Sequence, residues 1–199
     1  MAEITATQVK ELRDRTGAGM MDCRKALIEK NGNIDEAIKY LREKGISKAE
    51  GKANRATKEG IIHSYIHFNN RIGVLLELNC ESDFVARTDE FKALADEIAM
   101  QIAATNPLAI SPEQIDPAIL EREKEIAYNK AVNEGKKPEI IEKIVEGNLK
   151  KFCNEHSLLG QELISDSTKT VKDLLTNAIA TTGENIQIAR FVRYQLGGE

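Results

Sequence analysis

From Ile61 onward the spacing of the apolar residues changes, and this change restricts the fold more than any other feature of the chain. Up to that point apolar residues recur every three or four positions, as they do in amphipathic helices. From Ile61 to Leu78 they alternate with polar residues in two runs, which the turn residues Asn69 and Asn70 separate. Two alternating runs around such a turn predict a β-hairpin.

The alternation also predicts which side chains share a face. Ile62 and Ile66 alternate with His63 and His67, which places both histidines on the polar side of the first strand. A solvated or partner-facing imidazole is expected there rather than a metal ligand. The last alternating run of the chain is expected to carry four side chains on one face: Ile186, Ile188, Val192 and Tyr194.

Residues 1–45 carry the start and stop signals of three short helices. Thr5 and Gln8 have the spacing of a capping box at the start of the first helix, and Asn33 is a suitable N-cap for the third. Gly45 is expected to end that third helix. Three helices in so short a stretch predict a compact bundle with a thin core, which favours a binding module over an enzyme.

The interval 46–60 is rich in small and basic residues and predicts a connector. It carries four cations, Lys48, Lys52, Arg55 and Lys58. A solvated linker face and an RNA contact both fit this composition, and the linker is the more common role of such a charge run. The interval therefore separates the bundle from a second module.

Beyond the hairpin the spacing becomes helical again. One helix is expected at about 88–105, and Thr170 marks the start of another. Two patterns at about 118–134 and 138–152 have narrow apolar seams that face each other, which predicts an antiparallel helical hairpin that projects from the body. The alternating run at 186–196 is the natural third strand of the sheet.

Together these patterns predict an α+β fold with two modules. The three-helix bundle occupies 1–45, the connector 46–60 and the core domain 61–199. The core combines a three-stranded antiparallel sheet with helices, and the projecting helical hairpin lies at about 118–152. A chain of 199 residues suits a domain with a small companion.

The composition excludes several classes of protein. The chain has 28 basic and 32 acidic side chains, and a net charge of −4 argues against a broad phosphate-binding surface. No apolar run approaches the roughly 18 residues that span a membrane, and the first residues lack the pattern of a secretory signal. Three distant cysteines, Cys23, Cys80 and Cys153, predict neither a disulfide framework nor a zinc site. A reduced, cytoplasmic protein is expected.

A search for catalytic and cofactor motifs finds none. The sequence has no glycine-rich phosphate loop and no His-Glu-x-x-His motif. His63, His67 and His156 come without nearby carboxylate or thiol ligands in the sequence. We therefore expect no catalytic residues, no metal site and no cofactor.

Two stretches present apolar side chains where the chain changes direction. Asp83 and Phe84 stand at the junction between the second strand and the next helix, a place that is usually exposed. Phe84 either fills its own core or is directed at a partner, and Asp83 suits a helix start in either case. Met20 and Met21 follow a glycine-rich bend, where they serve either as core filler or as a soft contact surface.

Four stretches resemble a known family. They are Lys10–Cys23 (KELRDRTGAGMMDC), Leu78–Arg87 (LNCESDFVAR), the run from Gly135 to Lys151, and the ending Phe191–Tyr194 (FVRY). In this order and at this spacing they are similar to the elongation factor Ts family over essentially the whole chain. The first two stretches are long enough to make the resemblance specific.

The resemblance implies a guanine-nucleotide exchange factor that acts on elongation factor Tu with bound GDP. It implies that the first 45 residues form a ubiquitin-associated-like bundle, in which Leu12, Met20 and Met21 match residues that dock on the partner's GTPase domain. His67 is similar to a histidine that the family brings to the interface, although that alignment needs a gap of one residue.

The resemblance also implies how exchange works. Ser82, Asp83, Phe84 and Val85, here called the insertion segment, match the residues that dislodge magnesium from the partner's nucleotide site. Many relatives have Thr where this chain has Ser82, which keeps the hydroxyl. Such a mechanism uses binding energy alone, so the chain is not expected to be an enzyme.

The length of the chain matches the short form of the family. Longer relatives carry a duplicated core segment and a C-terminal module, whereas short members pair through the core sheet, so a homodimer is expected. No cysteine stands in the final strand, which leaves the dimer face open. No direct contact with nucleic acid is expected. The alternative is a translation-associated RNA-binding or adaptor protein that uses the connector.

Overall fold

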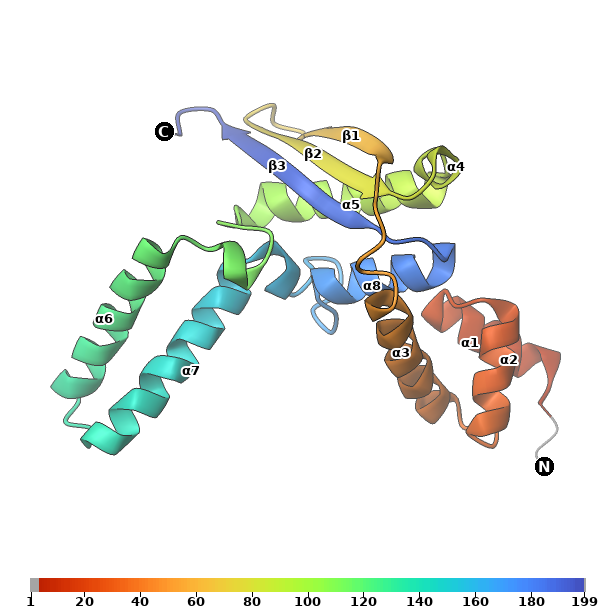
Figure 1. Cartoon of the computed structure of the whole chain (residues 1–199), viewed down its shortest axis with the longest axis horizontal. Helices are drawn as coiled ribbons and strands as arrows, with labels where there is room; N and C mark the ends of the chain where they lie inside the picture. The colour runs from red at the N-terminus through yellow and green to blue at the C-terminus, as the bar shows by residue number, and fades with distance from the viewer. Residues whose placement is uncertain (1–3, 199) are drawn as a thin grey trace. The chain divides into compact units, whose positions relative to one another are not determined.

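The fold is that of a computed structural model, which describes residues 4–198. The chain divides into two compact units. The first combines the residues up to His63 with 76–96 and 173–189, and the second combines 64–75 and 97–172 with the residues from Arg190 on. Figure 1 labels the helices and strands in chain order.

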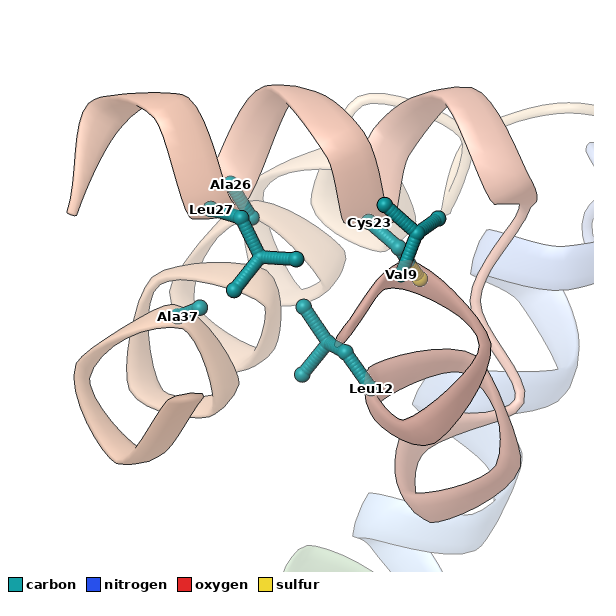
Figure 2. Packing of buried hydrophobic residues seen from close by; sticks show 6 residues of the cluster. All are labelled: Val9, Leu12, Cys23, Ala26, Leu27 and Ala37. Atoms are coloured by element: carbon teal, nitrogen blue, oxygen red, sulfur yellow. The ribbon is translucent and has the colours of Figure 1, made fainter. Parts of the chain in front are cut away.

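The N-terminal bundle consists of three helices, α1 (Ala6–Thr16), α2 (Met20–Glu29) and α3 (Ile34–Glu50). The predicted caps are confirmed. Thr5 and Gln8 form a reciprocal capping box, and the Asn33 side chain accepts a hydrogen bond from the Glu36 N–H at 3.1 Å. Figure 2 shows that side chains from all three helices converge on a small core: Val9, Leu12, Cys23, Ala26, Leu27 and Ala37.

The prediction that Gly45 ends the third helix is wrong. Helix α3 continues through Gly45 to Glu50, and Gly45 is buried. A Cβ atom at this position would lie 3.7 Å from the Cβ of Ala180 in α8 (Val171–Thr182). That distance is an ordinary van der Waals contact, so an alanine would also fit beside α8. Glycine is unfavourable in a helix by about 1 kcal/mol relative to alanine, and here the helix tolerates it within its interior.

The sheet has three strands, β1 (Glu59–Ile66), β2 (Ile72–Cys80) and β3 (Gln187–Gln195). They form the predicted three-stranded antiparallel sheet. The strand order is β1-β2-β3, so the last strand pairs with β2. Helix α5 (Asp89–Thr105) contacts the sheet through polar side chains in each unit. The His63 ring lies 3.2 Å from an Asp96 oxygen in the first unit, and in the second the Arg193 Nε donates to the Ala103 carbonyl at 3.1 Å.

The predicted faces of β1 are reversed. His63 and His67 are half-buried, whereas Ile62 and Ile66 are exposed. Strict alternation shows only that the two sets lie on opposite faces, and packing decides which face is covered. Here the polar set faces α5, because His63 is paired with Asp96 of that helix. Within the set, His67 is bonded to the Tyr65 hydroxyl.

The last strand also departs from its predicted pattern. Ile186 and Ile188 are buried as expected, but Val192 and Tyr194 are exposed. The burial pattern shifts by one residue, since Ala189 and Arg190 are both exposed. Alternation in the sequence places side chains on opposite faces but does not decide how far each face is covered along the strand.

The helical hairpin in the second unit consists of α6 (Pro117–Asn133) and α7 (Pro138–His156). The two helices run side by side in Figure 1, and α7 ends four residues later than predicted. Small and branched side chains form the seam: Ala127, Ala131, Ile141 and Val145. The remaining elements are one helical turn α4 (Asp83–Ala86) and the 3-10 turns η1 (Pro112–Gln114) and η2 (Leu158–Gly160).

None of the helices within residues 4–198 is both long and apolar enough to cross a membrane.

Candidate partner-binding site

The insertion segment is organised by a helix start. Ser82 is the N-cap of α4, and its hydroxyl accepts a hydrogen bond from the Val85 N–H at 3.4 Å. Serine is a favoured N-cap because its side chain satisfies a backbone donor that the helix leaves free. The junction between β2 and α5 is therefore a defined turn, although the sequence alone indicated only a change of element.

Neighbouring side chains of this turn have opposite environments. Val85 and Ala86 are buried, whereas the Phe84 side chain is 77% exposed. Of the two roles that the sequence left open for Phe84, that of a core plug does not apply in this structure. Asp83 lies in the first turn of α4, and its carboxylate pairs with Arg87 at 2.9 Å on the surface. The segment thus offers solvent an aromatic ring beside a paired acid.

The base of the segment is bound by Glu184, a residue that the sequence analysis missed. The Glu184 carboxylate accepts hydrogen bonds from the backbone N–H groups of Glu81 and Ser82 at 3.1 and 3.0 Å. It also accepts a bond from the Ser82 hydroxyl at 2.6 Å. No local pattern points to this role, because Glu184 and Ser82 are 102 residues apart in the chain.

A second set of bonds joins the base of the segment to the connector. Asn185 is buried, and its side-chain amide donates to the carbonyls of Ala53 and Arg55 at 3.3 and 2.8 Å. Its backbone N–H donates to the Glu81 carboxylate at 2.6 Å. The Arg55 guanidinium lies 3.4 Å from the same carboxylate. The turn that contains Glu184 and Asn185 therefore contacts both the connector and the insertion segment.

Cys80 is a structural residue at this site. Its thiol is buried and donates to the Ser82 carbonyl at 3.2 Å. Burial raises the pKa of the Cys80 thiol, and the nearby Glu184 carboxylate adds to that rise. A thiol with a raised pKa stays protonated at neutral pH and is a poor nucleophile.

The bundle presents two of its three predicted docking residues. Met20 and Met21 open helix α2 and are 54% and 62% exposed, so they are not core filler. Leu12 differs from them, because its side chain is 0% exposed and belongs to the core in Figure 2. In this structure Leu12 supports the bundle from inside and offers no surface to a partner.

His67 belongs to the second unit, whereas the other predicted site residues belong to the first. It is half-buried, and its Nδ1 lies 3.0 Å from the Tyr65 hydroxyl. The ring of Phe68, which is exposed, packs against it with centroids 4.4 Å apart.

Three of the four cations noted in the connector sequence contact other residues of the first unit. Lys48 pairs with Asp22 at 3.0 Å, and Arg55 with Glu81 at 3.4 Å. The Lys52 ammonium is 3.5 Å from a backbone carbonyl of α8, and burial lowers the pKa of Lys52. These contacts leave a smaller basic surface for RNA than the sequence indicated.

Residues 4–198 contain no group of three or more His, Cys, Asp or Glu side chains that could hold a metal ion.

The sequence was compared with known proteins. The family described as Elongation factor TS matches residues 1–198. Elongation factor Ts of Nitratidesulfovibrio vulgaris (strain DSM 19637 / Miyazaki F) is 57% identical over 196 residues, which cover 98% of this chain and 98% of that protein. Elongation factor Ts of Thermoanaerobacter sp. (strain X514) is 57% identical over 194 residues, or 98% and 95% of the two chains. Elongation factor Ts of Oleidesulfovibrio alaskensis (strain ATCC BAA-1058 / DSM 17464 / G20) is 55% identical over 197 residues, or 99% and 100%.

A family match over nearly the whole chain, with relatives of equal length, defines a class of protein, the elongation factors of protein synthesis. The chain belongs to the elongation factor Ts family.

Proposed function

We propose that this chain promotes the release of GDP from elongation factor Tu by placing the insertion segment against the partner's nucleotide site. The observation that carries the proposal is the arrangement at Phe84. An aromatic ring that is 77% exposed stands beside Asp83, on a turn whose base is fixed by hydrogen bonds. Family membership supplies the partner, and the geometry of the turn supports the mode of contact.

The proposed mechanism acts on magnesium. Mg²⁺ requires nearly ideal octahedral geometry, with ligands at roughly 2.0–2.1 Å, so a displacement of its protein ligands by about 1 Å weakens its binding. Burial of the Phe84 ring in an apolar gap of the partner would contribute about 2–3 kcal/mol. That free energy stabilises a conformation of the partner in which the metal and phosphate site is disturbed. By linkage, nucleotide in turn weakens the binding of this chain.

Docking by the bundle is the second part of the proposal. Met20 and Met21 form a flexible apolar surface that adapts to a partner helix. Leu12 contributes indirectly, because it holds α1 in the bundle core. In this proposal residues 1–45 are the docking module, 46–60 the connector and 61–199 the core. Exchange would take place in the cytoplasm, and this chain would make or break no covalent bond.

We also propose a homodimer that forms through the sheet face opposite α5. Arg193 points toward α5, so its neighbours Val192 and Tyr194 lie on the other face. Ile66 and Leu75 add exposed apolar side chains to that surface. Several exposed apolar residues on one sheet face are typical of a contact surface. Sedimentation equilibrium tests the dimer: a mass near 22.1 kDa at all concentrations would contradict it.

One assay tests the exchange function. Elongation factor Tu is loaded with a fluorescent GDP, excess unlabelled GDP is added, and the release of label is followed with and without this chain. We expect the release rate to rise with chain concentration and to reach a maximum. A rate that stays equal to that of the buffer control would refute the proposal.

A further inference from the structure

We infer that Glu184 is a positioning residue for exchange, which holds the insertion segment in the orientation that the partner receives. This inference rests on the proposed function and adds a residue to it that lies about 100 positions away in the chain. Glu184 itself is half-buried and is not part of the segment.

Glu184 completes the bonding of Ser82. The Ser82 N–H and hydroxyl both donate to the Glu184 carboxylate, and the same hydroxyl accepts from the Val85 N–H. The Ser82 carbonyl accepts from the Cys80 thiol and from the Ala86 N–H at 3.3 Å. Every polar atom of Ser82 is therefore engaged, although Phe84, only two residues later, is largely exposed.

A carboxylate matches this arrangement better than its amide would. Two N–H donors and one hydroxyl converge on Glu184, and a carboxylate accepts through both of its oxygens while donating nothing. Hydrogen bonds to a charged acceptor are shorter and about twice as strong as neutral ones, which agrees with the 2.6 Å separation from the Ser82 hydroxyl. In a glutamine the single amide oxygen could still accept both backbone N–H groups, which bond to the same Glu184 oxygen. Its N–H₂ group would then face the Ser82 hydroxyl, which could no longer donate to that position.

The position of this anchor explains why it would affect function. A side chain that inserts into a partner loses conformational freedom, and a preorganised segment loses less of it on binding. The anchor acts on the residue immediately before Asp83 and Phe84, so its loss would free the tip while the buried side chains of Val85 and Ala86 still hold the far end. We therefore expect slower exchange with an intact fold.

The test uses Glu184→Gln in the GDP-release assay. Loss of one charged hydrogen bond corresponds to roughly a tenfold effect, so we expect the maximal release rate to fall by about tenfold. The half-saturating concentration, which the bundle sets, should change by less than about twofold. Glu142→Gln, which removes the same charge from an exposed position on α7, serves as the matched control and should behave as wild type.

A second variant keeps the test informative if Glu184→Gln folds poorly. Ser82→Ala removes only the hydroxyl that Glu184 binds at 2.6 Å. It should reduce the maximal rate in the same way. The double variant should be clearly less impaired than the product of the two separate effects predicts, because the two residues share one interaction. Fully multiplicative effects would contradict a shared role.

A spectroscopic measurement tests positioning without the partner. The chain contains no tryptophan, so Phe84→Trp introduces a single tryptophan at the tip, which can be excited selectively over the four tyrosines. Adding Glu184→Gln should lower the fluorescence anisotropy of this reporter, whereas adding Glu142→Gln should not.

The inference is overturned if wild type stimulates GDP release and the Phe84 variants lose that stimulation, yet Glu184→Gln releases GDP at the wild-type rate. If wild type itself does not stimulate release, the proposed function fails, and the anisotropy still decides whether Glu184 holds the tip.

Discussion

The insertion segment and the bundle both present apolar side chains to solvent, but they support them in different ways. Phe84 stands on a turn that is fixed by directional bonds to one carboxylate. Met20 and Met21 stand on a helix that is fixed by a core in which Leu12 and Leu27 are fully buried. The first support is polar and depends on geometry, and the second is apolar and depends on packed volume.

This difference suggests a division of labour in the proposed exchange reaction. A ring that must displace groups around a metal has to arrive in one orientation, and directional hydrogen bonds provide that orientation. A docking surface has to adapt to another protein, and methionine side chains on a stable helix are suited to this. The comparison predicts that changes in the segment affect the maximal rate and that changes in the bundle affect the affinity.

The largest effect is expected for Phe84→Ala. If the ring contributes about 2–3 kcal/mol in the displaced state of the partner, its loss should lower the maximal rate of GDP release by roughly 30- to 150-fold. Affinity for the partner should fall less, because the bundle is unchanged. If this variant lost affinity but kept the wild-type maximal rate, the separate roles assigned to the segment and the bundle would be contradicted.

The control for this variant is its own stability. Phe84 is largely exposed in the free chain, so its removal should change the free energy of unfolding by no more than about 0.5 kcal/mol. Thermal unfolding followed by circular dichroism measures this. A large destabilisation would mean that the ring packs against its own chain in solution.

A smaller effect, and on affinity, is expected for Met20→Asp. The substitution places a charge in a contact that should be apolar, and loss of roughly 1.5 kcal/mol raises the dissociation constant about tenfold. At saturating concentration the release rate should return to that of wild type. Isothermal titration with elongation factor Tu measures the affinity, and Met20→Leu is the matched control because it keeps an apolar side chain of similar volume. Unaltered affinity would remove Met20 from the docking surface.

Local signals in the sequence predicted the elements of both regions. The capping residues Thr5 and Asn33 marked helix starts, and the alternating runs marked the three strands of the sheet. Helix ends were less certain, since Gly45 has the residue type of a stop but lies buried inside α3, next to Ala180 of α8. Such a contact depends on a helix more than a hundred residues away, and no local pattern contains it.

The candidate site was predicted in the same partial way. The junction left two roles open for Phe84, and the exposure of its ring excludes that of a core plug. No signal in the sequence pointed to its anchor at Glu184. For Leu12 the expected role was wrong in this structure: it was expected to dock on the partner, but its side chain is buried in the bundle core. Residue type and position alone did not distinguish these two roles. The faces of β1 were reversed for a related reason: alternation does not say which side α5 covers.

The smallest effect is expected from the ion pair that links α2 to α3 in the bundle, and it sharpens the contrast with Glu184. The hydrogen bond from Lys48 at 3.0 Å holds the pKa of Asp22 below its ordinary value of 3.8. Because both side chains are about one-third exposed, the pair should contribute only about 0.5 kcal/mol.

A carboxylate with a lowered pKa in the folded state stabilises the fold above the unfolded pKa, and this contribution disappears as the pH falls through the folded value. Asp22→Asn should therefore unfold slightly more easily than wild type at pH 7, and the difference should shrink below about pH 3.8. Thermal unfolding over a pH series measures this, with Glu29→Gln at the exposed end of the same helix as control. A difference that persisted unchanged in acid would show that Asp22 acts through packing, and an effect as large as that of Glu184→Gln on exchange would erase the distinction between the two kinds of support.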